Sequence, residues 1–340
     1  MIKVPKEVTK VLKTLGEAGF ECYVTGECVV GSMAGEKTYN WDVITKAAYE
    51  ELIELFPEAK VLSEKYSVLR QELIDEVRDE NGGIIGEEGM IIDISTYRTR
   101  NAGTSEENGK PLFTDKVEED LARRDFTIDA IAMNPYSAVN SIIDPYEGRE
   151  DVRKKMVRTI GDAKEAFRQE PIRMMKAVRY AAQFGFDLHK SVYEAISMNY
   201  KLLEKAAPER IRDEFTDIMA AKHAGRGLNM LMDTGLLRVI LGEREFEGLT
   251  RREKTDLLQL CEGIEKTKQV PERRLGLFYS SIGKKRAFPS IEKLNFDEET
   301  HQHLVDAVCD MAKLYFTAQP QDLKKFIYDR SMERYEYLAN

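Results

Sequence analysis

Asn40 and Asp42 form the first pair of residues whose types and spacing suggest chemistry. They lie two positions apart in the stretch YNWDVITKA, residues 39–47. In a β-strand, residues i and i+2 point to the same face of the sheet, so we expect the two side chains to lie side by side. Two carboxylates at this spacing clamp a divalent metal ion, and here one of the two is an amide. The triplet indicates a phosphoryl-transfer site, the remains of one, or an ordinary strand that enters a turn.

A glycine turn precedes this strand. The sequence predicts a strand over 21–25, a turn at Gly26 and a short helix that ends at Gly35. The N-terminus of a helix after a glycine turn offers free backbone N–H groups to a phosphate. A plain strand–turn–helix unit is the alternative. The order of a phosphate turn followed by an acidic strand favours a nucleotide site.

Further charged residues extend this pattern. Asp93 lies in IIDISTYR, on a strand otherwise rich in isoleucine, where aspartate is disfavoured without a purpose. It is either a third acid near the metal or a solvent-facing residue on an edge strand. Arg123 and Arg124 in LARRDFTIDAIAMNP can bind a triphosphate, because guanidinium groups pair with phosphate in a bidentate manner; an exposed pair is the alternative. Asp125 is expected to cap an apolar helical run that follows it.

A second charged group lies in the stretch EAFRQEPIRMMKAVRYAAQFGF, residues 165–186. Pro171 is typical of the first turn of a helix. Glu170, Arg173 and Lys176 recur at a helical spacing of three, which places an acid and bases on one face. A salt-bridged amphipathic helix is one interpretation. The other is a base-recognition helix, because an acid and an arginine together can hydrogen-bond the Watson–Crick edge of a nucleobase.

The elements that must position these side chains predict an α+β fold. The first part of the chain mixes the two kinds of signal, with expected helices at 6–18 and 47–56 and expected strands at 21–25, 40–45, 66–74 and 89–98. Turn formers at 99–117 predict a mobile loop. From 147 onward the chain is expected to be almost wholly helical, with Asp162 and Asp187 as caps. A mixed head followed by a helical body is a multi-domain α+β plan.

Composition restricts the class of protein. The 340 residues carry a net charge of −9, which argues against a generic nucleic-acid coat, although basic clusters such as RREK at 251–254 allow a local basic groove. The sequence contains no apolar run long enough to span a membrane. The four scattered cysteines and the lack of signal-peptide features at the N-terminus predict a cytoplasmic protein with reduced thiols. No feature of the sequence indicates an oligomeric state.

Taken together, the motifs resemble those of the class II CCA-adding enzyme and bacterial poly(A) polymerase family, within the polymerase-β-like nucleotidyltransferases. YVTGECVVGSMAG looks like the family's YxVGGxVRDxLLG, YNWDVIT like its DxD[IL]xT, and LARRDFTIDA like its LxRRDFTINA. The stretch from IIDPYEG to RYAAQFGF is similar to the family's junction between head and neck, and PERIRDEF continues the likeness. The resemblance covers roughly residues 1–315, in the family's order and spacing.

The resemblance implies a five-stranded head that holds two magnesium ions. It also implies that a tRNA 3′ hydroxyl attacks the α-phosphate of CTP or ATP. The expected partners are therefore a tRNA 3′ end and nucleoside triphosphates, and no membrane. The implied segments are a nucleotidyltransferase head over 1–146, a helical neck with the base-recognition helix over 147–220, a helical body over 221–315 and the shortened start of a tail over 316–340.

Residue roles follow by position. The resemblance implies Asp42, Asn40 and Asp93 as catalytic residues, with Asp42 and Asp93 as the metal ligands. The nucleotide-binding residues that it implies come from the glycine turn, the arginine motif and the neck: Gly26, Glu27, Arg123, Arg124, Asp125, Gln169, Glu170 and Arg173.

Several positions depart from the family pattern, and most of them belong to the motifs of one nucleotide pocket. Asn40 replaces the first metal acid, and Glu27 replaces the second glycine of the phosphate turn. The other departures in that pocket are Val30-Gly31, Lys65-Tyr66-Ser67 and Gln169-Glu170. Farther along the chain, Ser280 and Ser281 stand where some relatives carry a His-Asp pair, so no metal phosphohydrolase activity is expected there.

Two functions compete on these grounds. The first is a tRNA 3′-end nucleotidyltransferase with a partly degraded nucleotide site, which the retained Asp42, Asp93 and arginine motif favour. The second is a catalytically impaired or inactive relative that binds RNA or a protein partner through the scaffold, which Asn40 and Glu27 favour. An engineered asparagine at position 40 is a third explanation of that one departure.

Overall fold

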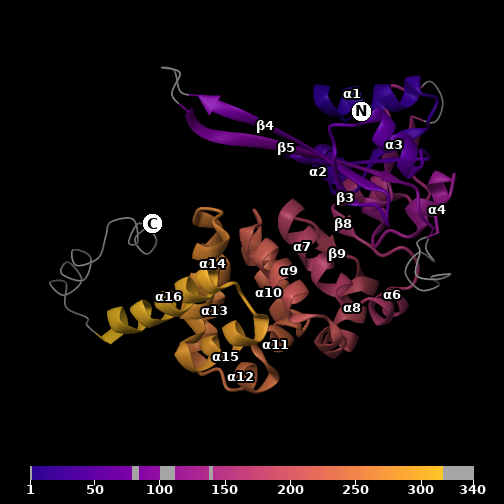
Figure 1. Cartoon of the computed structure of the whole chain (residues 1–340). Helices are drawn as coiled ribbons and strands as arrows, with labels where there is room; N and C mark the ends of the chain where they lie inside the picture. The colour runs from indigo at the N-terminus through magenta and orange to yellow at the C-terminus, as the bar shows by residue number, and fades with distance from the viewer. Residues whose placement is uncertain (1, 79–83, 100–111, 138–140, 317–340) are drawn as a thin grey trace. The chain divides into compact units, whose positions relative to one another are not determined.

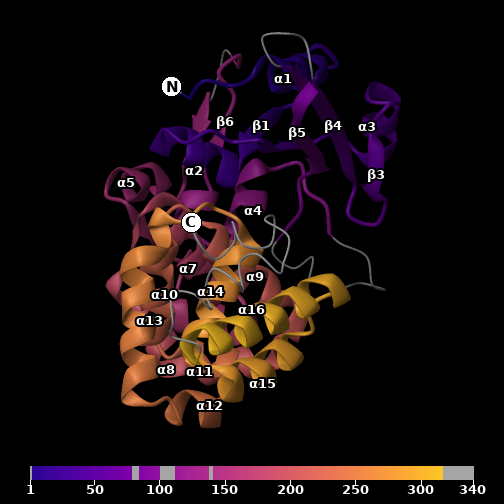
Figure 2. The same cartoon turned by 90° about the vertical axis from the view of Figure 1, so that its left-hand side faces the viewer.

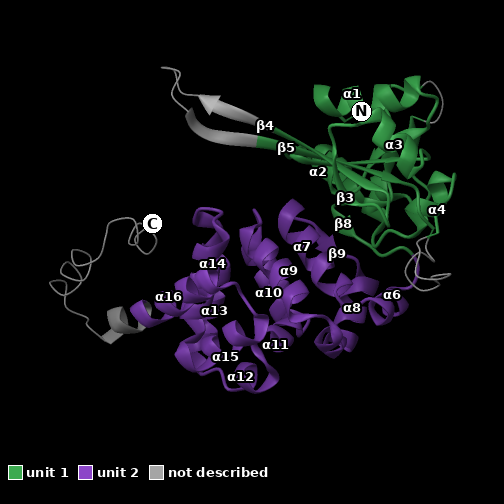
Figure 3. Ribbon diagram, in the orientation of Figure 1, with its two compact units in different colours: residues 1–160 green, residues 161–340 purple. Residues whose placement is uncertain are grey.

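Two compact units divide the chain between Ile160 and Gly161 (Figure 3). The computed structural model describes residues 2–78, 84–99, 112–137 and 141–316. The predicted α+β plan is confirmed, since the first unit combines a sheet with helices and the second is almost wholly helical (Figure 1). Residues 100–111 of the predicted loop, and the predicted tail from 317 onward, lie outside the described residues.

The first unit contains a seven-stranded sheet in the order β3-β4-β5-β2-β1-β6-β7. The strands of the sheet are β1 (Cys22–Thr25), β2 (Asn40–Thr45), β3 (Lys60–Ser63), β4 (Val68–Arg78), β5 (Ile84–Thr96), β6 (Ala132–Met133) and β7 (Ile142–Ile143). The unit also contains the short strand β8 (Met156–Val157), which lies outside this sheet. Its helices are α1 (Lys6–Glu17), α2 (Glu27–Ala34), α3 (Tyr49–Leu55), α4 (Val117–Ala122), the 3₁₀ turn η2 (Thr127–Asp129) and α5 (Gly148–Arg153).

The implied count of five strands was wrong. The five strands β1–β5 form one side of the sheet, but the backbone of Ala132 and Met133 pairs with Thr25 and Val24 of β1 and adds β6 as a further strand. β7 then pairs with β6. The apolar stretch after Asp125 therefore forms a 3₁₀ turn and a strand rather than the expected helix. The cap position of η2 belongs to Phe126 and not to Asp125.

Strand β2 alternates as the sequence predicts. Trp41 and Val43 are buried on one face of the sheet, which leaves Asn40 and Asp42 on the other face. Farther along β2, the Asp42 face becomes apolar, because Ile44 belongs to a buried cluster with Tyr23, Tyr97 and Leu121. The acidic part of β2 therefore lies beside a closed core on one side and open surface at Asn40 on the other.

The first unit extends past the predicted boundary at 146, because α5 packs on η2. A side chain at Gly148 would collide with the carbonyl of Thr127. The hydroxyl of Thr127 donates to Asp151 Oδ2 at 2.5 Å, and Arg158 Nε donates to the same oxygen at 2.9 Å. These contacts tie residues 148–158 to the head. The subdivision of the helical part into neck, body and tail stays a prediction.

The second unit is a stack of helices. They are α6 (Ala163–Gln169), α7 (Arg173–Phe184), α8 (Lys190–Asn199), η3 (Tyr200–Lys205), α9 (Pro208–Ala220), α10 (Ala224–Asp233), α11 (Leu236–Leu241), α12 (Glu243–Glu247), α13 (Arg251–Gly263), η4 (Ile264–Lys266), α14 (Pro271–Ile282), α15 (Lys284–Leu294) and α16 (Glu298–Phe316), with the short strand β9 (Asp187–Leu188) between α7 and α8. Helix α7 packs against α9 and α10, and α14 packs against α9, α13, α15 and α16 (Figure 2).

The helix ends confirm one predicted cap and correct another. Asp162 Oδ1 accepts the backbone N–H of Glu165 at 3.0 Å at the start of α6, as expected. Asp187 lies in β9, and the residue before α8 is His189, whose ring accepts from Ser191. Because Asp187 and Leu188 are extended, the cap of α8 lies two residues after Asp187. Among the described residues, no helix is both long and apolar enough to cross a bilayer.

Candidate active site

A row of charged residues crosses the middle of the head sheet. Asp42 on β2 is the register partner of Asp93 on β5, and Asp93 is the register partner of Arg70 on β4. On the other side of Asp42, Thr25 of β1 is its partner. Register partners in adjacent strands point to the same face. Asp42, Asp93 and Arg70 therefore lie side by side, and Asn40 follows on the same face of β2.

Arg70 holds the carboxylate of Asp93 by two hydrogen bonds. Its Nε donates to Oδ1 at 2.7 Å and its Nη2 donates to Oδ2 at 2.8 Å, with the two side chains 29% and 25% exposed. The hydrogen bonds to Asp93 raise the pKa of Arg70. Because β5 lies between β4 and β2, the alternative that Asp93 faces solvent on an edge strand is wrong. Arg70 was not among the residues that the sequence singled out.

Gly26 brings the glycine turn against Asp42. Gly26 precedes α2 with φ 79° and ψ −151°, a conformation that only glycine adopts readily. A Cβ atom at this position would lie 2.9 Å from Asp42 Oδ2 and 3.8 Å from Arg124 Nη1. The turn, the acid and the arginine motif therefore meet at one point. Glycine is required there both for its backbone angles and for the space.

The electrostatics of Asp42 reflect this crowding. Burial raises the pKa of the Asp42 carboxyl, and the charges of Asp93 and Glu27 raise it further, while Arg124 and Arg123 act in the opposite direction. Glu27, the first residue of α2, thus places a second negative charge beside Asp42. Asn40 is exposed at the start of β2. The site therefore holds three carboxylates, Asp42, Asp93 and Glu27, and the amide of Asn40.

The arginine motif is held by a buried acid that the sequence did not reveal. Asp120 of α4 has a fully buried side chain. Its Oδ1 accepts from Arg123 Nε at 2.9 Å and from the backbone N–H of Arg98 at 3.0 Å. Its Oδ2 accepts from Arg124 Nη2 at 3.1 Å. Asp120 therefore fixes both arginines, and the N–H of Arg98, at the edge of the acidic row.

Charge balance at this cluster favours an anion. Burial alone would raise the pKa of Asp120, but the charges of Arg124 and Arg123 outweigh it and hold the pKa below its ordinary value. Burial lowers the pKa of Arg123 to about 10. The Nε atoms of Arg98 and Arg124 are buried and have no hydrogen-bond partner among the described residues. Buried arginine N–H groups that lack a hydrogen-bond partner are suitable donors to a phosphate.

The predicted base-recognition residues gather in the second unit. Glu170 lies between α6 and α7, and its carboxylate contacts Arg173 Nη2 at 3.4 Å and Arg210 Nη2 of α9 at 2.8 Å. Arg173 is the first residue of α7, and its Nη1 donates to the carbonyl of Ala166 at 3.3 Å. Gln169 is exposed at the end of α6. Pro171 precedes α7 instead of standing in its first turn, because two residues of turn separate the helices.

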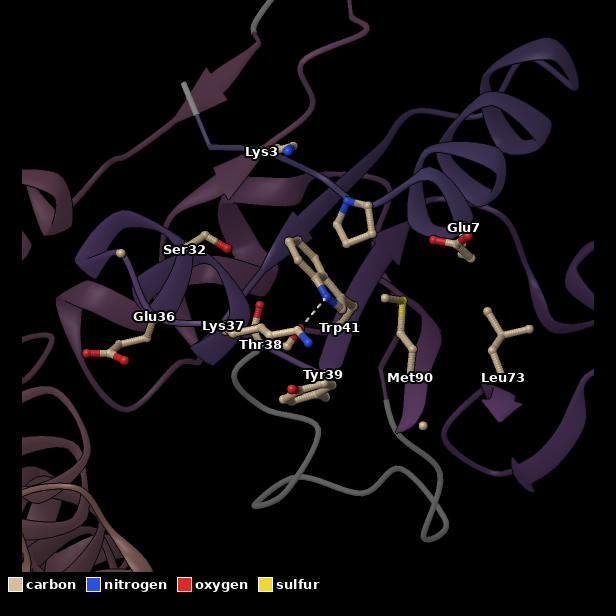
Figure 4. A pocket seen from close by; sticks show the side chains of 13 residues that line it. Lys3, Glu7, Ser32, Glu36, Lys37, Thr38, Tyr39, Trp41, Leu73 and Met90 are labelled. Carbon is tan, nitrogen blue, oxygen red and sulfur yellow. Dashed lines mark hydrogen bonds between the residues drawn. The ribbon is translucent and has the colours of Figure 1, made fainter. Parts of the chain in front are cut away.

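A cavity of about 430 Å³ lies on the opposite face of the sheet (Figure 4). Trp41, Tyr39, Leu73 and Met90 line it, and Trp41 Nε1 donates to the carbonyl of Thr38 at 3.2 Å. None of the predicted site residues lines this cavity. The alternation of β2 separates it from the charged row, so we place the candidate active site at Asp42 and the arginine motif.

Comparison with known proteins finds relatives for both units of the chain. Residues 22–158 match the family described as Poly A polymerase head domain, and residues 185–247 match the one described as Probable RNA and SrmB-binding site of polymerase A. A CCA-adding enzyme of Geobacillus stearothermophilus is 31% identical over 234 residues, which are 68% of this chain and 53% of that enzyme. The CCA-adding enzyme of Geobacillus thermodenitrificans is 32% identical over 69% of this chain and 54% of its own length.

The chain belongs to the poly(A) polymerase and CCA-adding enzyme family. A solved structure of the Bacillus stearothermophilus CCA-adding enzyme in complex with CTP has the same fold, with a TM-score of 0.76 at 24% identity over 98% of this chain and 76% of that one. This chain spans about half the length of the curated relatives it matches.

The side chains of this site carry the oxygen atoms that a divalent metal ion of the family would need. Their present arrangement, however, does not suit such an ion. Asp42, Asp93 and Asn40 offer the oxygen ligands that hard divalent ions prefer. Both oxygens of Asp93, however, are hydrogen-bonded to Arg70. Within the described parts of the chain, no three His, Cys, Asp or Glu side chains converge closely enough to hold a metal ion. As the side chains stand, they do not fit an ion that bridges Asp42 and Asp93.

Proposed function

We propose that this protein is a tRNA 3′-end nucleotidyltransferase of the CCA-adding type that uses CTP and ATP. The observation that carries the proposal is the meeting of Gly26, Asp42 and Arg124 at one point of a poly(A) polymerase head domain. The relatives that the chain resembles are named CCA-adding enzymes. The match of residues 185–247 to an RNA-binding region supports an RNA substrate.

The head residues have the chemistry that nucleotide binding needs. The backbone N–H groups that begin α2 after Gly26 can donate hydrogen bonds to a phosphate. Arg124 and Arg123, fixed by Asp120, present guanidinium groups to the rest of the triphosphate. Asp42 supplies the carboxylate nearest to both. Asp125, partly buried beside this pair, completes the group that we assign to the triphosphate and ribose.

Mg²⁺ is the divalent ion that we propose. It prefers carboxylate, phosphate and water oxygens, and it is usually held by one or two carboxylates together with substrate phosphates. Asp42 is the protein ligand that we assign to it, with Asn40 as a neutral neighbour on the same strand. Asp93 joins this set only when its carboxylate leaves Arg70. We also propose a cytoplasmic location, because Cys22, Cys28, Cys261 and Cys309 are free thiols, as is typical of a reducing compartment.

Asp42→Asn separates activity from folding. Burial disfavours the charged form of Asp42, so removal of the charge is expected to leave the head at least as stable. Nucleotide addition is expected to fall at least about a hundredfold, since even the outer partners of metal ligands cost 10–100-fold when they are lost. The assay incubates tRNA that lacks its 3′ end with labelled CTP or ATP and Mg²⁺ or Mn²⁺. Extension by both proteins would remove Asp42 from the mechanism.

Absence of extension by the natural chain as well would overturn the proposed activity. RNA binding would then be tested by a gel-shift assay, in which phosphate contacts weaken steeply as salt rises. The names of the relatives favour the enzyme over the scaffold that Asn40 and Glu27 suggested. The assay with natural chain therefore decides between the two functions that the sequence left open.

The neck residues are proposed to select the base. Glu170 and Arg173, with Gln169 beside them, carry the acceptors and donors that match a nucleobase edge. Arg173→Ala is expected to weaken CTP and ATP incorporation by about tenfold to a hundredfold, because one charge-assisted hydrogen bond contributes about 1.5–3 kcal/mol. The KM values for the two nucleotides measure the effect. Arg210→Ala is the matched control, since Arg210 also contacts Glu170, through a more exposed ion pair; an equal loss in both variants would argue for a merely structural role.

A further inference from the structure

Arg70 gives the acidic row an internal cation. Across three neighbouring strands the row reads Asp42, Asp93, Arg70, and the register pairs place all three on one face. The guanidinium group meets Asp93 through two parallel hydrogen bonds of 2.7 and 2.8 Å. This fork-to-fork geometry is the strongest common form of a pair between arginine and carboxylate. Asp93 is thus neutralised by the chain itself.

A metal ion and Arg70 need the same oxygen lone pairs. A divalent ion binds a carboxylate through one or both oxygens, and here Nε and Nη2 each occupy one. The positive charge of Arg70 also acts on Asp42, one strand farther away. An ion that binds Asp42 and Asp93 together must therefore displace the guanidinium group from Asp93. It must also overcome the repulsion of that positive charge, which stays close by. Partial exposure of Arg70 leaves a path for that side chain toward solvent.

We propose that Arg70 is an intrinsic competitor of the divalent cation for Asp93, so that the natural chain binds such an ion through Asp42 without Asp93. Arg70 is then a positioning residue that sets how many protein carboxylates reach the metal. The inference deepens the proposed function, on which it rests for the identity of the site. It concerns cation binding alone, which is measured without RNA or nucleotide.

Titration of the full chain with Mn²⁺, followed by electron paramagnetic resonance of the free ion, tests this competition. Arg70→Gln removes the cation and keeps a shorter, polar and unbranched side chain. We expect it to raise the Mn²⁺ affinity by about tenfold or more, because one opposing unit charge and one competitor are lost together. Asp93→Asn alone leaves the charge of Arg70 uncompensated beside Asp42, so it is used only together with Arg70→Gln. The same change added to Arg70→Gln is expected to cancel the gain.

Arg153→Gln is the matched control, since Arg153 forms a comparable two-bond pair with Glu150 through exposed side chains of α5 in the same unit. It is expected to leave Mn²⁺ binding unchanged. Arg70→Lys serves if Arg70→Gln does not fold, because an ammonium group cannot hold both oxygens and should give a smaller gain.

Equal Mn²⁺ affinity in the natural chain and both Arg70 variants would overturn the inference. A gain from Arg70→Gln that persists when Asp93→Asn is added would also overturn it, since the gain would then not depend on Asp93. Neither result would bear on nucleotide addition, which the tRNA extension assay measures separately.

Discussion

Asp120→Asn is expected to destabilise the first unit by about 3–5 kcal/mol, the cost of removing one partner from a buried ion pair. Asp120 is fully buried and accepts hydrogen bonds from Arg123, Arg124 and the backbone of Arg98. The amide keeps the size of the side chain but leaves two partly buried guanidinium groups with no counter-charge at this position. We therefore expect a lower free energy of unfolding of the first unit, and also a displacement of Arg123 and Arg124.

The unfolding of this unit can be followed selectively. Trp41 is the only tryptophan of the chain and is 2% exposed on β2, so tryptophan fluorescence in a urea titration reports on the head and not on the helical unit. Glu119→Gln is the control one residue away, where an exposed pair with Lys116 is worth little. A difference below about 1 kcal/mol between the natural chain and Asp120→Asn would contradict the role of Asp120 as the anchor of the motif.

The pH dependence of this stability has a definite sign. The pKa of Asp120 in the folded protein lies below its ordinary value of 3.8. Its stabilising contribution is therefore complete above pH 3.8 and is lost as the pH falls through the folded pKa. Asp120→Asn should remove this part of the acid unfolding, whereas Glu119→Gln should retain it.

The local sequence pattern was sufficient to predict much of the structure of the head. The alternation in NWDVIT placed Asn40 and Asp42 on one face and Trp41 on the other, because side chains of a strand alternate wherever one face is buried. The glycine turn before α2 was also predictable, since its backbone angles require glycine. A short apolar run is ambiguous between helix and strand. The stretch after Asp125 was therefore misassigned until its pairing with β1 was known.

Asp120 and Arg70 escaped sequence analysis for different reasons. Asp120 precedes Arg123 and Arg124 by three and four residues, the spacing of ion pairs on a helix, so the signal was present but was hidden among the neighbouring acids of VEEDLA. Arg70 meets Asp93 only through the register of β4 with β5. That register is a long-range property, and the spacing of the two residues in the sequence does not reveal it.

Glu27→Gly combined with Asn40→Asp is expected to raise nucleotide addition by about tenfold to a thousandfold. Two unit charges about 4 Å apart repel by roughly 4 kcal/mol at an effective dielectric constant of 20, which is close to a thousandfold in binding. Glu27 lies at the start of α2, beside Asp42 and at the turn that we assign to phosphate. Its removal takes a negative charge from the triphosphate site and lets the backbone approach more closely.

The two changes act on different steps, and single variants separate them. Glu27→Gln removes the charge but keeps the side chain, so it should lower the KM for CTP and ATP by most of the gain if repulsion dominates. Asn40→Asp restores an acid on the Asp42 face and should act mainly on kcat in the presence of a divalent ion. Glu58→Gln, at an exposed position of the same unit, controls for the change in net charge. Equal extension by the natural chain and the double variant would show that Glu27 turns away from the nucleotide or has itself become a ligand of the metal.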